Sequence, residues 1–241
     1  HPLAPDDVFN IGYLPEELGL YKKMKVGEQA IYLAQIKGLS RAEAKRRLQQ
    51  WFEKFEITQW WDKKLEELSK GMAQKVQFII TVLHEPQLLI FDEPFSGFDP
   101  VNADLLKREI LELRDKGHTI IFSTHNMESV EAICDDIALI NRSQVVLEGA
   151  VDEVRNRYRT GTFELVVEQG TLDPRPELYT IESSTPHRSL TTYQLRKSPD
   201  LTTSQLLGHL ATQPLAIRSF TEQMPSLHEI FVQTVSAANH E

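Results

Sequence analysis

The segment QLLIFDEPFSGFDP, residues 87–100, is the most informative part of this sequence. Its apolar portion, Leu88–Phe91, has the length of a strand and ends in two adjacent carboxylates, Asp92 and Glu93. The pattern predicts a buried strand, and open α/β sheets bind their ligands beyond the carboxyl ends of such strands. We therefore expect a ligand site at these two acidic residues.

Asp92 and Glu93 suit two different tasks. Side chains alternate along a strand, which predicts that the two carboxylates point to opposite sides. One of them can hold a hard cation such as Mg²⁺ through oxygen, while the other orients a water molecule. Nucleotide hydrolysis requires both tasks. Taken alone, the pair is equally consistent with a strand that ends in an acidic turn at Pro94.

The composition predicts a soluble globular protein. The 241 residues are 41% hydrophobic and 25% charged, which is too apolar for a disordered chain. The formal net charge of -9 disfavours non-specific binding to nucleic acid or to an anionic membrane surface. The single cysteine, Cys134, excludes an intrachain disulfide framework and suits a reducing compartment. The longest apolar run, Phe78–Leu83, is far shorter than the ~20 residues that a membrane helix needs.

A second strand is expected at Thr119–Phe122, where β-branched residues indicate a buried position. A helix over residues 100–116 is expected to connect the two strands. The sequence Ser-Thr-His, residues 123–125, then leaves the carboxyl end of the second strand. A single histidine after a strand is usually structural, but an imidazole can also hydrogen-bond a phosphate oxygen and sense its loss.

The region before the first of these strands is expected to be helical, after a short strand at Ile11–Leu14. A helix is predicted over residues 26–37, closed by Gly38. Ser40 and Glu43 predict a capping box at the start of the next helix.

Ser69 is expected to cap a helix over residues 70–84. The free N–H groups and the dipole of that helix end would attract an anion such as phosphate. Gly71 would let the backbone come close to such a ligand. Without further context, a helix cap alone also explains Ser69.

The remaining sequence indicates an accessory domain. A hairpin is expected over residues 136–141 and 144–148, followed by a short helix over residues 151–158. Further strands are expected over residues 162–168, 178–182 and 190–196, with helices over residues 203–211 and from Ser226. This alternation suggests a small α+β domain, in which no catalytic constellation is evident.

Four motifs, in their order and spacing, resemble those of the ATP-binding cassette (ABC) ATPase family. Leu68–Met72 resembles the signature loop, and Leu88–Pro94 resembles the Walker B segment. Ser96–Pro100 resembles the D-loop, and Ser123–His125 resembles the switch-histidine motif. The resemblance covers roughly Ile11–Gly149, and together the four motifs are much more specific than any one of them.

This resemblance implies an α/β fold related to the P-loop NTPases. It places a nucleotide-binding domain at residues 1–158, with an α-helical subdomain at about residues 26–84. Residues 159–241 would form the C-terminal accessory α+β domain. The sequence SLHEIF, residues 226–231, is similar to the ending of bacterial exporter-type cassettes of the sodium- and drug-export kind.

The resemblance also implies roles at the carboxyl ends of the strands. Glu93 would be the general base or water-positioning residue, Asp92 the carboxylate that holds Mg²⁺, and His125 a contact to the γ-phosphate. Glu16 aligns with a glutamine that, in the family, touches Mg²⁺ and the attacking water. Glu16 is therefore a second candidate ligand of Mg²⁺, although an exposed loop glutamate is an equally good interpretation.

Three further residues are implied in a site shared with a partner cassette. Ser69 and Gly71 would bind the nucleotide of the opposite cassette, and Asp99 would couple the two sites. The usual signature of the family is LSGGQ, whereas this chain has Lys70 and Met72 in place of the first glycine and the glutamine.

The function implied is that of an ATPase subunit that uses ATP and Mg²⁺ to power export through a separate membrane permease. Its partners would be a second cassette, either an identical copy or a paralogue, and the integral membrane permease. No nucleic-acid partner is expected. Such a subunit would be cytoplasmic and peripheral on the inner face of the cell membrane.

The phosphate-binding motif GxxxxGK[S/T] does not occur in the 241 residues. That loop supplies a backbone cradle, a lysine for the phosphates and a hydroxyl for Mg²⁺. We therefore expect an N-terminally truncated cassette or a degraded reading frame that binds ATP poorly and hydrolyses little of it. An exposed sheet edge and apolar faces are expected with it. A non-catalytic regulatory module derived from an ABC ATPase, or a soluble ABC ATPase that works outside transport, remain as alternatives.

Overall fold

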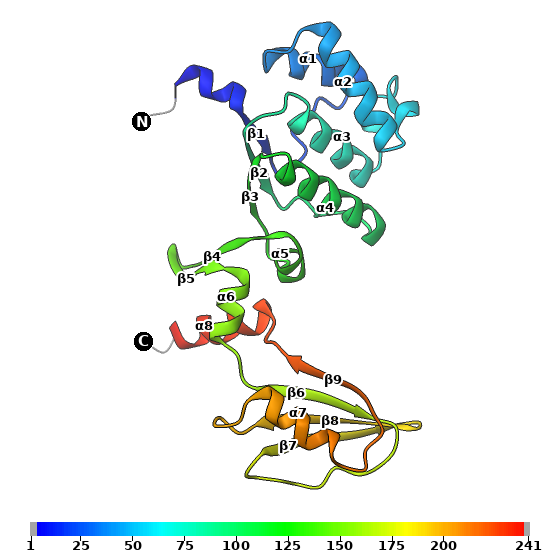
Figure 1. The fold of residues 1–241 in the computed structure, drawn as a ribbon. Coiled ribbons are helices and arrows are strands. Elements are labelled where there is room, and N and C mark those ends of the chain that lie inside the picture. Colours follow the sequence, from blue (N-terminus) through cyan, green and yellow to red (C-terminus); the bar gives the residue numbers. More distant parts are fainter. Residues whose placement is uncertain (1–3, 239–241) are drawn as a thin grey trace. The chain divides into compact units, whose positions relative to one another are not determined.

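Figure 1 shows a computed structural model of the protein, which describes residues 4–238. The chain divides into two compact units between Asn126 and Met127. Each unit is described by itself below.

The first unit contains a three-stranded sheet in the order β1-β2-β3. Strands β1 (Ile11–Leu14), β2 (Leu88–Asp92) and β3 (Thr119–Ser123) are all parallel. Their register aligns Leu14 with Phe91 and Phe91 with Phe122. Because parallel strands in register end together, the residues that follow β1, β2 and β3 leave the sheet at one edge. The expected α/β class is confirmed.

Helices lie on one side of the sheet of the first unit (Figure 1). They are α1 (Val26–Ile36), α2 (Arg41–Lys54), α3 (Lys70–Val82) and α4 (Pro100–Asp115), with 3₁₀ turns at Pro5–Asn10, Thr58–Trp60 and Leu65–Glu67. Phe78 of α3 meets Phe91 of β2 with ring centroids 5.7 Å apart, and both side chains are fully buried. Burying two aromatic side chains at one contact contributes several kcal/mol, about 1.5–3 for each ring, so this pair anchors α3 to the sheet. Nowhere in residues 4–238 is a helix both long and apolar enough to span a membrane.

The helix ends follow the sequence closely, with one correction. Gly38 has a φ of +90°, the left-handed conformation that closes α1. Ser40 caps α2, since its hydroxyl accepts a hydrogen bond from the Glu43 N–H at 3.2 Å. The expected return bond from the Glu43 side chain is wrong, because that carboxylate instead accepts bonds from Arg46 and Arg47. Two guanidinium donors compete better for a carboxylate than one backbone N–H does.

The prediction that β3 is buried is also wrong. Ile121, at its centre, is 55% exposed, and so is Tyr13 on β1. The two residues align through Ile90, so they lie on the same face of the sheet. β3 is an edge strand of this sheet. Its β-branched residues correctly indicated a strand, but they do not show whether the strand is buried.

The second unit begins with a small helical cluster. It contains α5 (Met127–Ile133), the hairpin β4 (Asp136–Asn141) and β5 (Gln144–Ala150), α6 (Val151–Arg157), and α8 (Leu227–Ala238). Val151 and Val154 of α6 are buried against Leu227 and Ile230 of α8. This cluster ties residues 127–157 to the C-terminal helix. The domain boundary expected at residue 158 stays a prediction, and residues 1–3 and 239–241 of those two domains lie outside the described residues.

An antiparallel sheet in the order β7-β8-β6-β9 completes the second unit. Its strands are β6 (Thr162–Val167), β7 (Tyr179–His187), β8 (Leu190–Lys197) and β9 (Ile217–Gln223), and α7 (Thr203–Ala211) packs on it through the buried Leu206 and Leu210. The α+β character of this part is confirmed. Strand β9 was not predicted, because its sequence IRSFTEQ lacks a clean alternation.

Gly12 of β1 provides a test of how tightly the first sheet packs. A Cβ at this position would lie 2.7 Å from the Thr81 carbonyl oxygen and 2.8 Å from Cδ2 of Leu89. Gly12→Ala should therefore lower the free energy of unfolding by about 1–3 kcal/mol. All three tryptophans lie in residues 51–61 of the first unit, so urea unfolding followed by tryptophan fluorescence reports on this unit.

Gly19→Ala is the matched control for Gly12→Ala, because its Cβ would meet only Cγ of Pro15, at 3.9 Å. The control should unfold at the urea concentration of the parent chain. An equal midpoint for Gly12→Ala and the parent would contradict the packing described for β1.

His84 is expected to make the stability of the first unit depend on pH. Its Nε2 lies 3.3 Å from the Ile11 carbonyl oxygen, and its Nδ1 is buried without a hydrogen-bond partner among residues 4–238. Burial lowers the pKa of His84 to about 4. The unfolded chain therefore binds a proton more readily, and stability should fall as the pH drops from about 6.5 towards 4. In His84→Gln, the urea midpoint should depend less steeply on pH across that window, and an unchanged slope would contradict this role.

Candidate functional site

Asp92 is the last residue of β2, and the register places it beside Ser123, the last residue of β3. The Ser123 hydroxyl donates a hydrogen bond to Oδ1 of Asp92 at 2.5 Å. The Asp92 side chain is only partly covered. One oxygen of this carboxylate is therefore held by the protein, while Oδ2 accepts no hydrogen bond from the residues that the structure describes.

Glu93 directly follows the strand and has a left-handed φ of +45°. Its N–H donates to the Ser123 carbonyl oxygen at 2.9 Å. Oε2 accepts a bond from Oγ1 of Thr124 at 2.9 Å, while Oε1 accepts from the N–H of His125 at 2.9 Å and from its ring Nδ1 at 2.7 Å. The expected alternation of side chains thus applies only as far as Asp92, since Glu93 has left the strand conformation.

His125 lies at the surface with 89% of its side chain exposed, whereas Glu93 is 17% exposed. An ionised carboxylate only accepts hydrogen bonds, so the ring proton of His125 lies on Nδ1. Nε2 has no partner in the described part of the chain. That nitrogen can donate to a phosphate oxygen only when the imidazole is doubly protonated, so such a contact requires the imidazolium form.

Glu16 reaches the same sheet edge from β1. It is exposed and follows Leu14 by two residues, as Glu93 follows Phe91. Nε2 of Gln77, on α3, holds this loop by donating to the carbonyl oxygens of Pro15 at 3.1 Å and Glu17 at 3.2 Å. No hydrogen bond between described residues joins Glu16 to Asp92 or Glu93. The structure therefore brings Glu16 to the correct edge without building it into the carboxylate cluster.

The fit of Mg²⁺ to these residues rests on Asp92. Residues 4–238 contain no group of three or more His, Cys, Asp and Glu side chains arranged to hold a metal ion. Mg²⁺ that is bound together with phosphate oxygens needs only one or two carboxylates, since water and phosphate fill the other positions. Oδ2 of Asp92 is a hard oxygen on a partly exposed side chain. It therefore suits Mg²⁺ that is bound together with phosphate and water.

Ser69 and Gly71 lie at the start of α3, and Asp99 lies at the start of α4. The Ser69 hydroxyl accepts a bond from the Met72 N–H at 3.3 Å, which confirms the predicted cap of α3. A Cβ on Gly71 would lie 3.3 Å from the carbonyl oxygen of Gly97. The signature-like and D-loop-like segments therefore pass close to each other within one chain.

Asp99 is the N-cap of α4. Its Oδ1 accepts a bond from the Asn102 N–H at 3.0 Å, and this bond is the main cause that lowers the Asp99 pKa. A carboxylate that stays ionised also interacts favourably with the helix dipole. The bonds of Asp99 stay within its own helix end and do not reach Glu93 or His125.

Ser123 and Thr124 are site residues whose contacts are not predictable from the sequence alone. The signal that identifies them is the parallel pairing of β2 with β3, which places each hydroxyl beside one carboxylate. That pairing cannot be deduced from either strand alone.

Two family models match the sequence. The first, described as ABC transporter, matches residues 6–96 and so includes Asp92 and Glu93. The second, described as ATP-binding protein DrrA1-3-like, C-terminal domain, matches residues 149–235. The two models match different parts of the chain and agree in kind.

Relatives match nearly the whole chain. An uncharacterized ABC transporter ATP-binding protein of Bacillus subtilis, YhaQ, is 40% identical over 94% of this chain and 75% of its own length. An uncharacterized ABC transporter ATP-binding protein of Alkalihalophilus pseudofirmus is 37% identical over 95% of this chain and 84% of its own. A solved ATP-binding subunit of an ABC transporter is similar with a TM-score of 0.58 and 33% identity, over 62% of each chain.

Proposed function

The chain belongs to the ABC transporter ATP-binding proteins, and we propose that it provides the hydrolytic carboxylates of an ATPase that powers export through a separate membrane permease. Members of this family bind ATP, generally with Mg²⁺, and work as dimers with membrane permeases. One observation carries the proposal: Glu93 is held by three hydrogen-bond donors next to Asp92, at the carboxyl edge of a parallel sheet.

In this proposal, Glu93 positions the attacking water and accepts its proton. A carboxylate fixed by several donors is pre-organised, so little reorganisation is needed when the reaction begins. Asp92 would hold Mg²⁺ through Oδ2, and such an ion would supply positive charge next to the phosphates. Glu16 would be a second Mg²⁺ ligand, contributed by the loop that follows β1.

His125 contacts the γ-phosphate through its exposed Nε2, while Nδ1 stays on Glu93. An imidazole that donates to Glu93 from Nδ1 and to the phosphate from Nε2 carries a positive charge, because both of its nitrogens are protonated. The exposure of His125 leaves Nε2 accessible to a ligand. We propose that ATP approaches from this side of the sheet edge.

Ser69, Gly71 and Asp99 serve a second cassette, which is either another copy or a paralogue. Ser69 is exposed, and backbone N–H groups in the first turn of α3 have no acceptor within the helix, so they suit a phosphate. Gly71 and Gly97 keep the signature-like and D-loop-like segments close, so a movement of one segment would displace the other.

The permease partner places the subunit on the cytoplasmic face of the membrane. Export, rather than import, rests on the exporter-like ending at residues 226–231.

The missing phosphate-loop motif leads to a first test. The 241 residues alone should show no saturable binding of Mg-ATP at submillimolar concentrations in calorimetric titration, because no residues in them supply the β- and γ-phosphate cradle. Tight binding would show that this chain holds phosphates by other residues. The regulatory-module alternative is favoured if the protein encoded by its gene also fails to bind.

The catalytic role is tested by Glu93→Gln in the protein as its gene encodes it, assembled with its permease. The amide keeps the shape of the side chain but cannot accept a proton, so ATP turnover should fall by at least about 100-fold. Binding of Mg-ATP should remain within about threefold of the parent, because Glu93 is not proposed to hold the phosphates.

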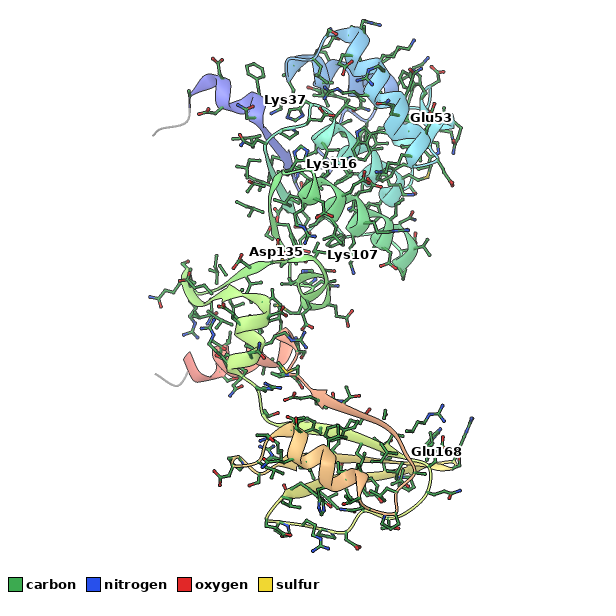
Figure 2. All side chains as sticks on the ribbon, viewed as in Figure 1. Lys37, Glu53, Lys107, Lys116, Asp135 and Glu168 are labelled. Carbon is green, nitrogen blue, oxygen red and sulfur yellow. The ribbon has the colours of Figure 1, made fainter. Side chains whose placement is uncertain are left out.

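Glu53→Gln is the matched control, since Glu53 is an exposed carboxylate on α2 (Figure 2). This variant should hydrolyse ATP like the parent. Normal turnover by Glu93→Gln would remove Glu93 from the proposed role and with it the main support for an ATPase.

A further inference from the structure

Thr124 lies in the sequence between Ser123, which donates to Asp92, and His125, which donates to Glu93. Its Oγ1 is 2.9 Å from Oε2 of Glu93 and 3.1 Å from the backbone nitrogen of Asn126. The Asn126 N–H must donate to the hydroxyl oxygen, because a backbone N–H is a donor only. The hydroxyl proton is therefore left to point at Glu93.

This arrangement limits what the Glu93 carboxylate can still bind. Its two oxygens offer about four acceptor positions in all. His125 takes two of them on Oε1, through its N–H and Nδ1, and Thr124 takes one on Oε2. One acceptor position remains, also on Oε2, and 17% of the Glu93 side chain is exposed to solvent.

The backbone of Glu93 is also held in place. Glu93 has a φ of +45°, which costs a non-glycine residue of order 1 kcal/mol or more. Its own N–H bonds to the Ser123 carbonyl oxygen, and its carbonyl oxygen accepts from the Ser96 N–H at 3.0 Å. With the main chain held at both ends, rotation of the carboxylate is the freedom that remains, and Thr124 restricts it.

We infer that Thr124 is a positioning residue, whose hydroxyl holds Oε2 of Glu93 so that a single acceptor position faces the attacking water. The inference rests on the proposed function. Thr124 acts through Glu93 and does not itself meet the phosphates, since its one hydroxyl proton is used inside the protein. Its loss should therefore slow turnover without weakening the binding of ATP.

The test compares Thr124→Val and Thr124→Ala, which lack the hydroxyl, with Thr124→Ser, which keeps it. ATP turnover is measured on the assembled protein encoded by its gene. Both hydroxyl-free variants should lower kcat by about tenfold, the effect of one lost positioning hydrogen bond, with KM for ATP within about twofold of the parent. Thr124→Ser should restore at least half of the parent kcat.

Thr119→Val is the matched control, because Thr119 is exposed at the start of β3, the strand whose end precedes Thr124. It should leave both kinetic constants unchanged. The urea midpoint of each variant, followed by tryptophan fluorescence, shows whether the first unit is folded. Because Val and Ala differ in size but not in the missing hydroxyl, two folded variants with opposite effects on kcat would overturn the inference.

The result for Glu93→Gln, measured alongside, separates the two ideas. If Glu93→Gln turns over ATP normally, the proposed function fails. If Glu93→Gln is inactive while Thr124→Val keeps the parent kcat, only the role of Thr124 fails. A kcat for Thr124→Ser as low as that of Thr124→Val would likewise overturn the hydroxyl argument.

Discussion

The parallel pairing of β2 with β3 is the interaction on which the candidate site depends. Its register sets Asp92 beside Ser123, and every donor to the two carboxylates follows from that single alignment. A shift of one residue would turn the side chains of one strand to the other face and separate the hydroxyls from the carboxylates. The buried contact between Phe78 and Phe91 holds β2 in place from the helical side. The core packing that positions β2 therefore also positions the carboxylates at the edge of the sheet.

Ser123 and Thr124 give neighbouring carboxylates different surroundings. Asp92 keeps the strand conformation and accepts one hydroxyl, whereas Glu93 adopts a left-handed backbone and accepts three donors. A strained residue persists only where its neighbours determine its conformation, and here both its main chain and its side chain are fixed by residues 123–125. In the proposed function, these different environments suit Asp92 to metal binding and Glu93 to water positioning.

Local features of the fold were predictable from the sequence. The strand at Leu88–Phe91, the cap at Ser69 and the helix over residues 203–211 depend on neighbouring residues alone, and the structure confirms them. Features that depend on distant partners were not predictable. Strand β9 is defined by its pairing with β6, and the exposure of Ile121 by the position of β3 at a sheet edge. The roles of Ser123 and Thr124 belong to the same class, since they follow from register. The roles predicted for all seven site residues stay predictions: Glu16, Ser69, Gly71, Asp92, Glu93, Asp99 and His125.

The order of the three parallel strands also bears on how the first unit folds. Ile11 of β1 pairs with Leu88 of β2, and the helices α1, α2 and α3 all lie in the sequence between them. Closing so long a loop is slow, because its entropy is lost before the strand pairing stabilises it. The helical segment, which is rich in local contacts, is therefore expected to form first and to bring the two strands together. The carboxyl edge that carries Glu16, Asp92 and His125 would then be completed late, when β1 docks.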